Sequence, residues 1–300
     1  MGISIRPIGD HRLDREAGAI IYPVLSRRSR GLSVGINLFP SRKVCSFDCP
    51  YCEVHPFHTD LAFSLQAMER GLRDLAELLH FNHAPDMVQD LSFSGSGEPT
   101  MHPDFDKALT LAARLRNELF PTSSLVLITN GSGLLNQALA DFLAQAARGE
   151  TPGMRGISEA LHIWLKLDAG TDGWYKKINR SPIPFDMLNE AIEAFARRAP
   201  FIIQTMICKI DGQLPPPEEV AAWEANIGRL VALAGPSENR LLEPGSPIQR
   251  GPQAVQLYGK ARPAPEDPKA EPADETYLAE RRASLLEALA PYSLPVEVFV

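Results

Sequence analysis

The chain has 300 residues, of which 44% are hydrophobic and 22% are charged, and its formal net charge is −7. This composition is typical of a globular protein that buries a core, and the net negative charge disfavours a broad nucleic-acid-binding surface. With no run of 18 apolar residues, no apolar stretch at the start and only four cysteines, the sequence predicts a cytoplasmic protein without a membrane span or a disulfide framework.

Short β-rich runs alternate with amphipathic stretches along the chain from residue 33. In the first half, the patterns predict a strand at Ser33–Phe39, a helix at Leu61–Phe81, a strand at Val88–Phe93, a helix at Pro103–Leu119, a strand at Ser124–Thr129 and a helix at Leu134–Ala147. In the second half, they predict a strand at His162–Leu167, a helix at Phe185–Arg198, a strand at Phe201–Lys209, a helix at Pro215–Ala234, a strand at Ala254–Gly259, a helix at Glu275–Leu289 and a strand at Val296–Val300.

This alternation predicts an α/β protein with a parallel sheet. Two topologies fit, an open doubly wound sheet and a curved partial barrel of (β/α)6 type, and both place ligands at the carboxyl ends of the strands. We expect residues 1–32 to form an N-terminal extension and residues 33–300 to form one domain with a C-terminal helix and a short final strand.

Three cysteines lie within one predicted loop, in the segment CSFDCPYC, at Cys45, Cys49 and Cys52. Thiolates at this spacing can converge on one metal centre, and three ligands leave an iron of a [4Fe-4S] cluster open for a further ligand. Two alternatives fit the same residues. A zinc site would recruit His55, and an electron-transfer cluster would use Cys208, which otherwise is a small buried residue of its strand.

The segment CSFDCPYC resembles the C-x-x-x-C-x-x-C signature of the radical S-adenosylmethionine (SAM) superfamily, with the aromatic Tyr51 before the last cysteine. The resemblance implies a partial TIM barrel, a [4Fe-4S] cluster held by the three cysteines, and SAM bound at the open iron. It also implies that a 5′-deoxyadenosyl radical abstracts hydrogen from a substrate. An electron donor such as flavodoxin or ferredoxin would be the expected partner.

Two further segments resemble motifs of this superfamily. The turn SGSGEPT, after the strand Val88–Phe93, is similar to its GGEP motif, and the resemblance assigns the SAM amino group to Gly95, Gly97 and Glu98. At the end of a later strand, alternation places Lys166 and Asp168 on one face. The resemblance assigns these two to the SAM carboxylate and ribose, with catalytic roles for them and for Glu98. Tyr51 of the cysteine motif is a further candidate for cofactor contact, and weaker candidates are Thr129, Asn130 and Gln204.

A narrower resemblance covers most of the chain, through the segments YPVLSRR, GIN, GSGEPTMHP, LITNGS, KLDAG, KINR and VQL. These look similar to the radical SAM group that includes the wyosine-base-forming tRNA enzymes, which carry a second cluster on additional N-terminal cysteines. Residues 1–44 contain no cysteine. We therefore favour a peptide or a small anionic metabolite as substrate, with modification of a tRNA base as the alternative. Candidate substrate-binding residues in the predicted mouth are Arg27, Arg28, Asn179 and Arg180.

Overall fold

A computed structural model describes residues 19–54, 56–151, 161–234, 250–262, 264 and 269–300. The chain divides into two compact units, the first formed by residues 1–45, 54–129 and 149–162, and the second by residues 46–53, 130–148 and 163–300. The cysteine loop passes from one unit to the other, because Cys45 belongs to the first unit whereas Cys49 and Cys52 belong to the second.

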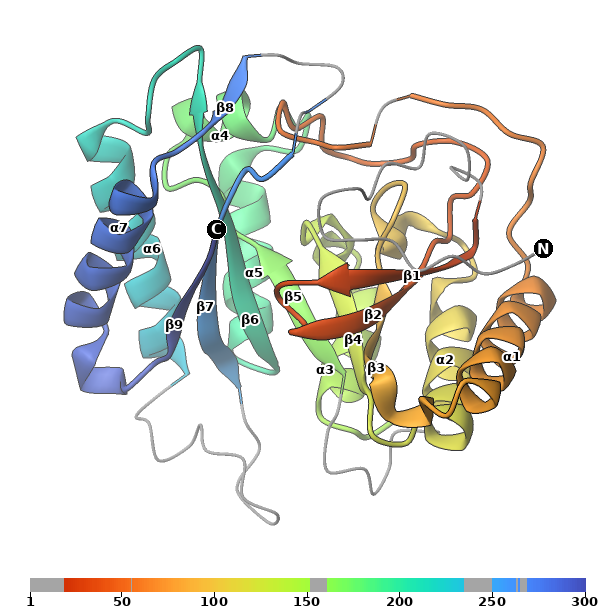
Figure 1. Ribbon diagram of the computed structural model, residues 1–300. Coiled ribbons are helices and arrows are strands. Elements are labelled where there is room, and N and C mark those ends of the chain that lie inside the picture. Colours follow the sequence, from red (N-terminus) through yellow and green to blue (C-terminus); the bar gives the residue numbers. More distant parts are fainter. Residues whose placement is uncertain (1–18, 55, 152–160, 235–249, 263, 265–268) are drawn as a thin grey trace. The chain divides into compact units, whose positions relative to one another are not determined.

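The first unit contains a mixed sheet with two helices (Figure 1). Strand β1 (Ile21–Ser26) pairs antiparallel with β2 (Gly31–Ile36), and β2, β3 (Val88–Phe93) and β4 (Ser124–Thr129) are parallel. Helix α1 (Leu65–Phe81) packs against α2 (Phe105–Leu119), and single turns of 3-10 helix occur at Pro85–Met87 and Pro99–Met101. Helix α1 begins at Leu65 because the Ser64 side chain caps it by accepting from the Ala67 N–H.

The second unit carries the parallel strands β5 (His162–Lys166), β6 (Pro200–Ile210), β7 (Gly251–Gly259) and β9 (Val296–Phe299), with His162 itself assigned to the first unit. The short strand β8 (Ala270–Pro272) pairs antiparallel with the end of β6. Its helices are α3 (Gln137–Ala147), α4 (Asp172–Ile178), α5 (Phe185–Ala196), α6 (Pro217–Leu233) and α7 (Glu275–Ala288), with 3-10 turns at Ser132–Leu135 and Ala290–Tyr292.

The predicted alternation of strands and helices is confirmed, and among the described residues three elements besides the 3-10 turns were not predicted. The sequence patterns did not predict strand β1, because Pro23 interrupts its run of β-forming residues. Proline is tolerated there since β1 is an edge strand. Helix α4 and strand β8 are too short to give a periodic signal. Residues 1–18 of the expected extension lie outside the described residues, and the division at residue 32 stays a prediction. Among the described helices, none is long and apolar enough to span a membrane.

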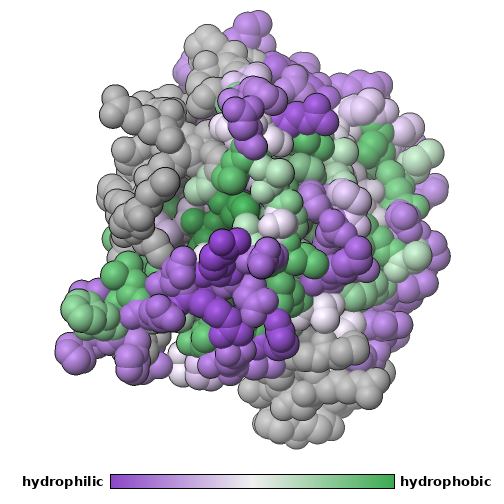
Figure 2. All heavy atoms as spheres, turned by 90° about the vertical axis from the view of Figure 1, so that its right-hand side faces the viewer, coloured by the Kyte–Doolittle hydropathy of each residue, from purple (hydrophilic) through white to green (hydrophobic). Residues whose placement is uncertain are grey.

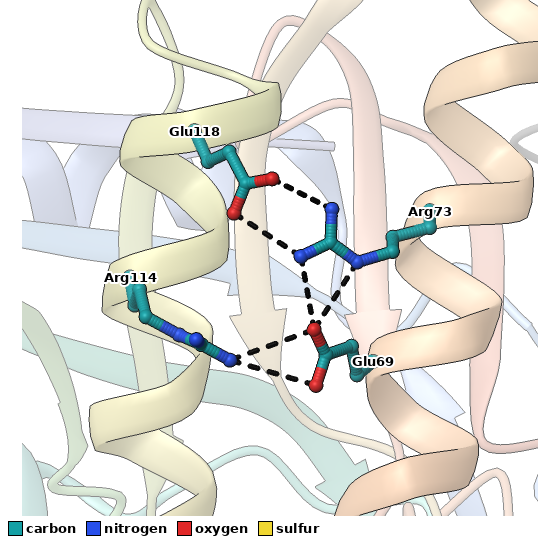
Figure 3. A network of polar contacts seen from close by, with 4 residues as sticks. All are labelled: Glu69, Arg73, Arg114 and Glu118. Carbon is teal, nitrogen blue, oxygen red and sulfur yellow. Dashed lines mark hydrogen bonds and ion pairs between the residues drawn. The ribbon is translucent and has the colours of Figure 1, made fainter.

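Opposite charges join the exposed faces of α1 and α2 (Figure 3). Arg73 contacts Glu69 at 2.9 Å on its own helix and Glu118 at 2.6 Å on α2, while Arg114 reaches back to Glu69 at 3.5 Å. Figure 2 views the face on which α1 lies, and hydrophilic residues gather around the middle of that face. Exposed ion pairs of this kind add little stability, so the α1–α2 contact depends on the apolar residues beneath.

Substitution Arg73→Ala tests this balance. The change removes the charge shared by Glu69 and Glu118, so we expect the melting temperature to fall by no more than about 3 °C in low salt. The difference should shrink in 1 M NaCl, which screens exposed charges. Calorimetric melting of both proteins at the two salt concentrations measures it. A large loss that persists in high salt would contradict this description of the network.

Candidate functional site

The glycine turn after β3 receives the residue that precedes Cys45. Val44 donates its N–H to the Ser96 carbonyl at 3.0 Å, and the Val44 carbonyl accepts from the Glu98 N–H at 2.8 Å. Gly97 has a φ of +152°, and a Cβ at this position would lie 1.8 Å from the Val44 carbonyl oxygen. The sequence suggested that these glycines make room for a ligand. At Gly97, the atom that approaches closely belongs to the chain itself.

The carboxylate of Glu98 is buried in the same turn and is 3% exposed. Its Oε1 accepts from the Thr100 N–H at 3.2 Å, from the Thr100 hydroxyl at 2.6 Å and from the Thr129 hydroxyl at 2.7 Å. Thr129 ends β4, so the predicted residues Glu98 and Thr129 are brought together within the first unit. These bonds fix the orientation of the carboxylate. Gly95, with a φ of +114°, would place a Cβ 2.9 Å from Asn37.

In the second unit, Ser46 is held by side chains from two loops. Asn130 donates to the Ser46 hydroxyl at 3.0 Å, that hydroxyl donates to Ser132 at 2.8 Å, and the Ser181 hydroxyl donates to the Ser46 carbonyl at 3.3 Å. The sequence predicted Asn130 as a contact for SAM. The structure instead places its amide nitrogen on the cysteine loop, and its Oδ1 accepts from the Ser132 N–H at 2.9 Å.

Asn179 connects the second cysteine to a buried carboxylate. Its side-chain amide lies 3.6 Å from the Cys49 sulfur and 2.8 Å from Asp168 Oδ2, and its carbonyl accepts from the Asp48 N–H at 3.0 Å. The residue is 2% exposed. The sequence assigned Asn179 to a substrate, but its amide donates to the protein's own sulfur and carboxylate. Its neighbour Arg180 is exposed, with a φ of +46°.

Asp168 accepts three hydrogen bonds, forms one ion pair and has no exposed side-chain surface. Its Oδ2 accepts from the Tyr51 hydroxyl at 2.5 Å and from Asn179, and forms an ion pair with Lys166 at 3.3 Å, while its Oδ1 accepts from the Met206 N–H at 2.9 Å. A carboxylate offers about four acceptor positions, so this one has little capacity left for a ligand. Lys166 has three donors, of which one binds Asp168 and another meets the Tyr258 hydroxyl at 2.5 Å.

The charges of this cluster follow from its burial. Burial acts to lower the pKa of Lys166, but the negative charge of Asp168 and the contact with Tyr258 outweigh it and raise the pKa, so Lys166 is cationic. Burial and the Asp168 charge raise the pKa of Tyr51. The phenol therefore stays protonated, and its hydroxyl donates a hydrogen bond to that carboxylate. Burial also raises the pKa of the Cys49 thiol to about 12, against the opposing effect of Lys166.

Amide side chains form a ladder across the same sheet. The buried Gln204 donates to Gln256 Oε1 at 2.8 Å, and Gln256 donates to Glu297 at 3.3 Å. Gln204 was a predicted cofactor contact, whereas Gln256 and Tyr258 were missed. A signal existed, because Gln256 and Tyr258 alternate with apolar residues in the segment VQLYG. We call the surface formed by Lys166, Asp168, Gln204, Gln256 and Tyr258 the polar face of the second unit.

The sequence analysis placed Arg27 and Arg28 at the mouth of the barrel, and this prediction is wrong. Both lie in the turn between β1 and β2, where Ser26 pairs with Gly31 and Leu32 pairs with Val88 at the start of β3. The glycine turn follows the other, carboxyl end of β3. The two arginines therefore lie at the amino-terminal end of β2 and β3, away from the glycine turn. They lie there because β1 runs antiparallel to β2 and the hairpin reverses the chain at that end.

The cysteine loop carries three thiols that could serve as metal ligands. Cys45, Cys49 and Cys52 form no disulfide and are partly exposed, and the Asn179 amide donates toward the Cys49 sulfur. Within the described residues, side chains alone do not form a ready-made group of three close metal-ligating residues. Cys208 is 1% exposed within β6, as expected for a small buried residue, and His55 of the zinc alternative lies outside the described residues.

No family model matches the chain. A UPF0026 protein of Synechocystis is 30% identical over 251 residues, which are 82% of this chain and 77% of that protein. The chain belongs to the UPF0026 family. It also matches a protein named GTPase Obg of Brachyspira hyodysenteriae at 30% identity over 180 residues, but this chain spans only 23% of that protein's length. This UPF0026 chain has no G-x-x-x-x-G-K-S/T phosphate-binding loop.

Solved structures of radical SAM enzymes share the fold. SuiB of Streptococcus suis bound to SAM matches with a TM-score of 0.58 and 15% identity, over 89% of this chain and 50% of that chain. A radical SAM methyltransferase from Sphaerobacter thermophilus matches with a TM-score of 0.56 and 14% identity, over 92% and 68%. At such identities the likeness shows the fold alone. That fold is the predicted α/β partial TIM barrel of radical SAM type, not the open doubly wound sheet.

Substitution Gly97→Ala tests the close approach of Val44. A Cβ there would overlap the Val44 carbonyl, so we expect a loss of about 3 kcal/mol in the free energy of unfolding. Gly173→Ala is the matched control, because a methyl group added to this residue of α4 would meet nothing within 4 Å and alanine favours a helix. Urea unfolding compares the three proteins. Equal stability of Gly97→Ala and wild type would contradict the described contact.

Proposed function

We propose that this UPF0026 protein is a radical SAM enzyme in which Cys45, Cys49 and Cys52 hold a [4Fe-4S] cluster and SAM occupies the open iron. The C-x-x-x-C-x-x-C spacing and the fold likeness to radical SAM enzymes support the class. The observation that carries the proposal is the Asn179 amide, which donates both to Cys49 and to the carboxylate that holds Lys166. A simple zinc loop needs no such link to a buried cation.

When bound, the cluster and SAM supply a 5′-deoxyadenosyl radical that can abstract hydrogen from a substrate. The chain's own residues would bind SAM and orient it. Lys166, cationic and with a donor to spare, suits the SAM carboxylate, while Asp168 holds Lys166 and Tyr51 in place. Glu98, fixed by hydroxyl donors, is proposed to accept from the SAM amino group. Gln204 is a proposed contact for the nucleoside.

For the electron donor and the substrate, only the class of molecule is proposed. A flavodoxin or ferredoxin is the proposed electron donor, since the cluster must be reduced. Modification of a tRNA base, suggested by the wyosine-type segments, remains the alternative function, although the net charge of −7 and the cysteine-free residues 1–44 disfavour it.

The central proposal is tested by anaerobic reconstitution with iron and sulfide, followed by reductant and SAM. We expect 5′-deoxyadenosine from the wild type and none from Cys52→Ala, which should also lose cluster absorbance. Cys208→Ala is the matched control, because this buried thiol is not a proposed ligand, and it should keep the cluster. Zinc as the tightly held metal, or an unchanged metal content in Cys52→Ala, would refute the proposal.

Asn179→Leu tests the hydrogen bond to the cluster ligand. Leucine keeps most of the volume but removes the donor to the Cys49 sulfur, and hydrogen bonds to such sulfurs raise a cluster's reduction potential. We expect a more negative midpoint potential, with iron content near that of wild type, in a titration followed by electron paramagnetic resonance. Asn226→Leu is the control, since its amide bonds Asn189 instead. A loaded cluster with an unchanged potential would contradict the assignment.

A further inference from the structure

The polar face continues past the residues so far described. Along β7, alternation puts Gln256 and Tyr258 on this face, and their bonds to Gln204 and Lys166 confirm it. Two residues beyond Tyr258 stands Lys260, directly after the strand. In the register, Ile207 of β6 pairs with Gly259, so the next residues along the chain are Cys208 in β6 and Lys260 just after β7. Both follow the alternation of the polar face.

Electrostatics agrees with this placement. Burial raises the pKa of the Cys208 thiol to about 12; the charge of Asp168 adds to this increase, and the positive charges of Lys260 and Lys166 oppose it. The Cys208 side chain therefore lies within electrostatic reach of both lysines. Lys166 is already paired with Asp168.

Lys260 differs from Lys166 in having no anionic partner among the described residues. It is 9% exposed, yet no hydrogen bond or ion pair joins its side chain to any residue in that part of the chain. The carboxylates on neighbouring elements are engaged elsewhere: Glu297 accepts from Gln256, and Glu53 pairs with Arg262. The Lys260 side chain is mostly buried and has no counter-charge in the described part of the chain, so an anion that binds beside its ammonium group would supply the missing partner.

We propose that Lys260 binds an anionic group of the substrate, a carboxylate or a phosphate, at the end of the polar face beside Tyr258. This inference rests on the proposed function, because it places the substrate's charge next to the residues assigned to SAM. Lys260 thereby takes the anion-binding role that the sequence gave to Arg27 and Arg28. Those two arginines lie at the amino-terminal end of the parallel strands of their own sheet.

The test uses the reconstituted full chain with saturating SAM and two probes, inorganic phosphate and malonate, followed by isothermal titration calorimetry. We expect the wild type to bind at least one probe and Lys260→Met to bind it about tenfold more weakly or worse, since a charged hydrogen bond is lost. Lys260→Arg should keep most of the affinity. A preference for phosphate identifies a phosphorylated substrate, and a preference for malonate identifies a carboxylate.

Lys209→Met is the matched control. Lys209 stands one residue after Cys208, on the opposite side of β6 by alternation, and contacts Asp274 at 3.7 Å, so its loss should leave probe binding unchanged. Melting curves of every variant report folding. If Lys260→Met unfolds, the comparison of Lys260→Arg and Lys209→Met with wild type still decides: loss of binding in the control, or in the arginine variant, rejects the site.

Two further results would overturn the inference. One is that neither probe binds the wild type, or that Lys260→Met binds as wild type does. The other is that Lys260→Met weakens SAM binding about tenfold, which would assign Lys260 to the cosubstrate instead. Formation of 5′-deoxyadenosine is measured on the same samples. A protein that cleaves SAM but binds no probe rejects only this inference, whereas one that binds probes without cleaving SAM rejects the proposed function.

Discussion

The buried carboxylate of Asp168 organises the polar cluster of the second unit. A carboxylate without exposed surface is tolerated only where donors surround it, and here a phenol, an amide, an ammonium and a backbone N–H do so. Each donor belongs to a different segment: the cysteine loop, the residues after α4, the end of β5 and the middle of β6. One charge thus sets the orientation of Tyr51, Asn179 and Lys166 together, and removal of any partner would leave another buried polar group unsatisfied.

The sheet of the second unit keeps its two sides chemically distinct. Ile203, Val255 and Leu257 are fully buried, as the helix-covered side of a parallel sheet requires. The alternate positions hold Gln204 and Gln256, which are as buried as their apolar neighbours but bonded to each other. Amides buried in this way contribute less to stability than apolar side chains of the same size would, and such departures from the local rule are expected at functional sites.

The cysteine loop is fixed by backbone contacts before Cys45 and by side chains after it. Val44 forms a bridge to the glycine turn, which exists because Gly97 has no Cβ. Ser46 is held by three polar side chains, and Cys49 by Asn179. These contacts order the loop backbone on both sides of Cys45, so less conformational entropy remains to be lost if the loop binds a ligand.

The sequence alone determined the alternation of strands and helices and the cysteine loop, because these depend on local periodicity and on residue types with a narrow chemistry. It placed Lys166 and Asp168 on one face for the same reason. Only the tertiary structure decided which predicted residues serve the protein itself: Asn130 and Asn179 anchor the cysteine loop, and the β1–β2 hairpin carries Arg27 and Arg28 to the amino-terminal end of the parallel strands of their sheet. The mostly buried position of Lys260, without a counter-charge among the described residues, became visible only there as well. Burial and pairing are properties of contacts between distant segments, and no spacing along the chain encodes them.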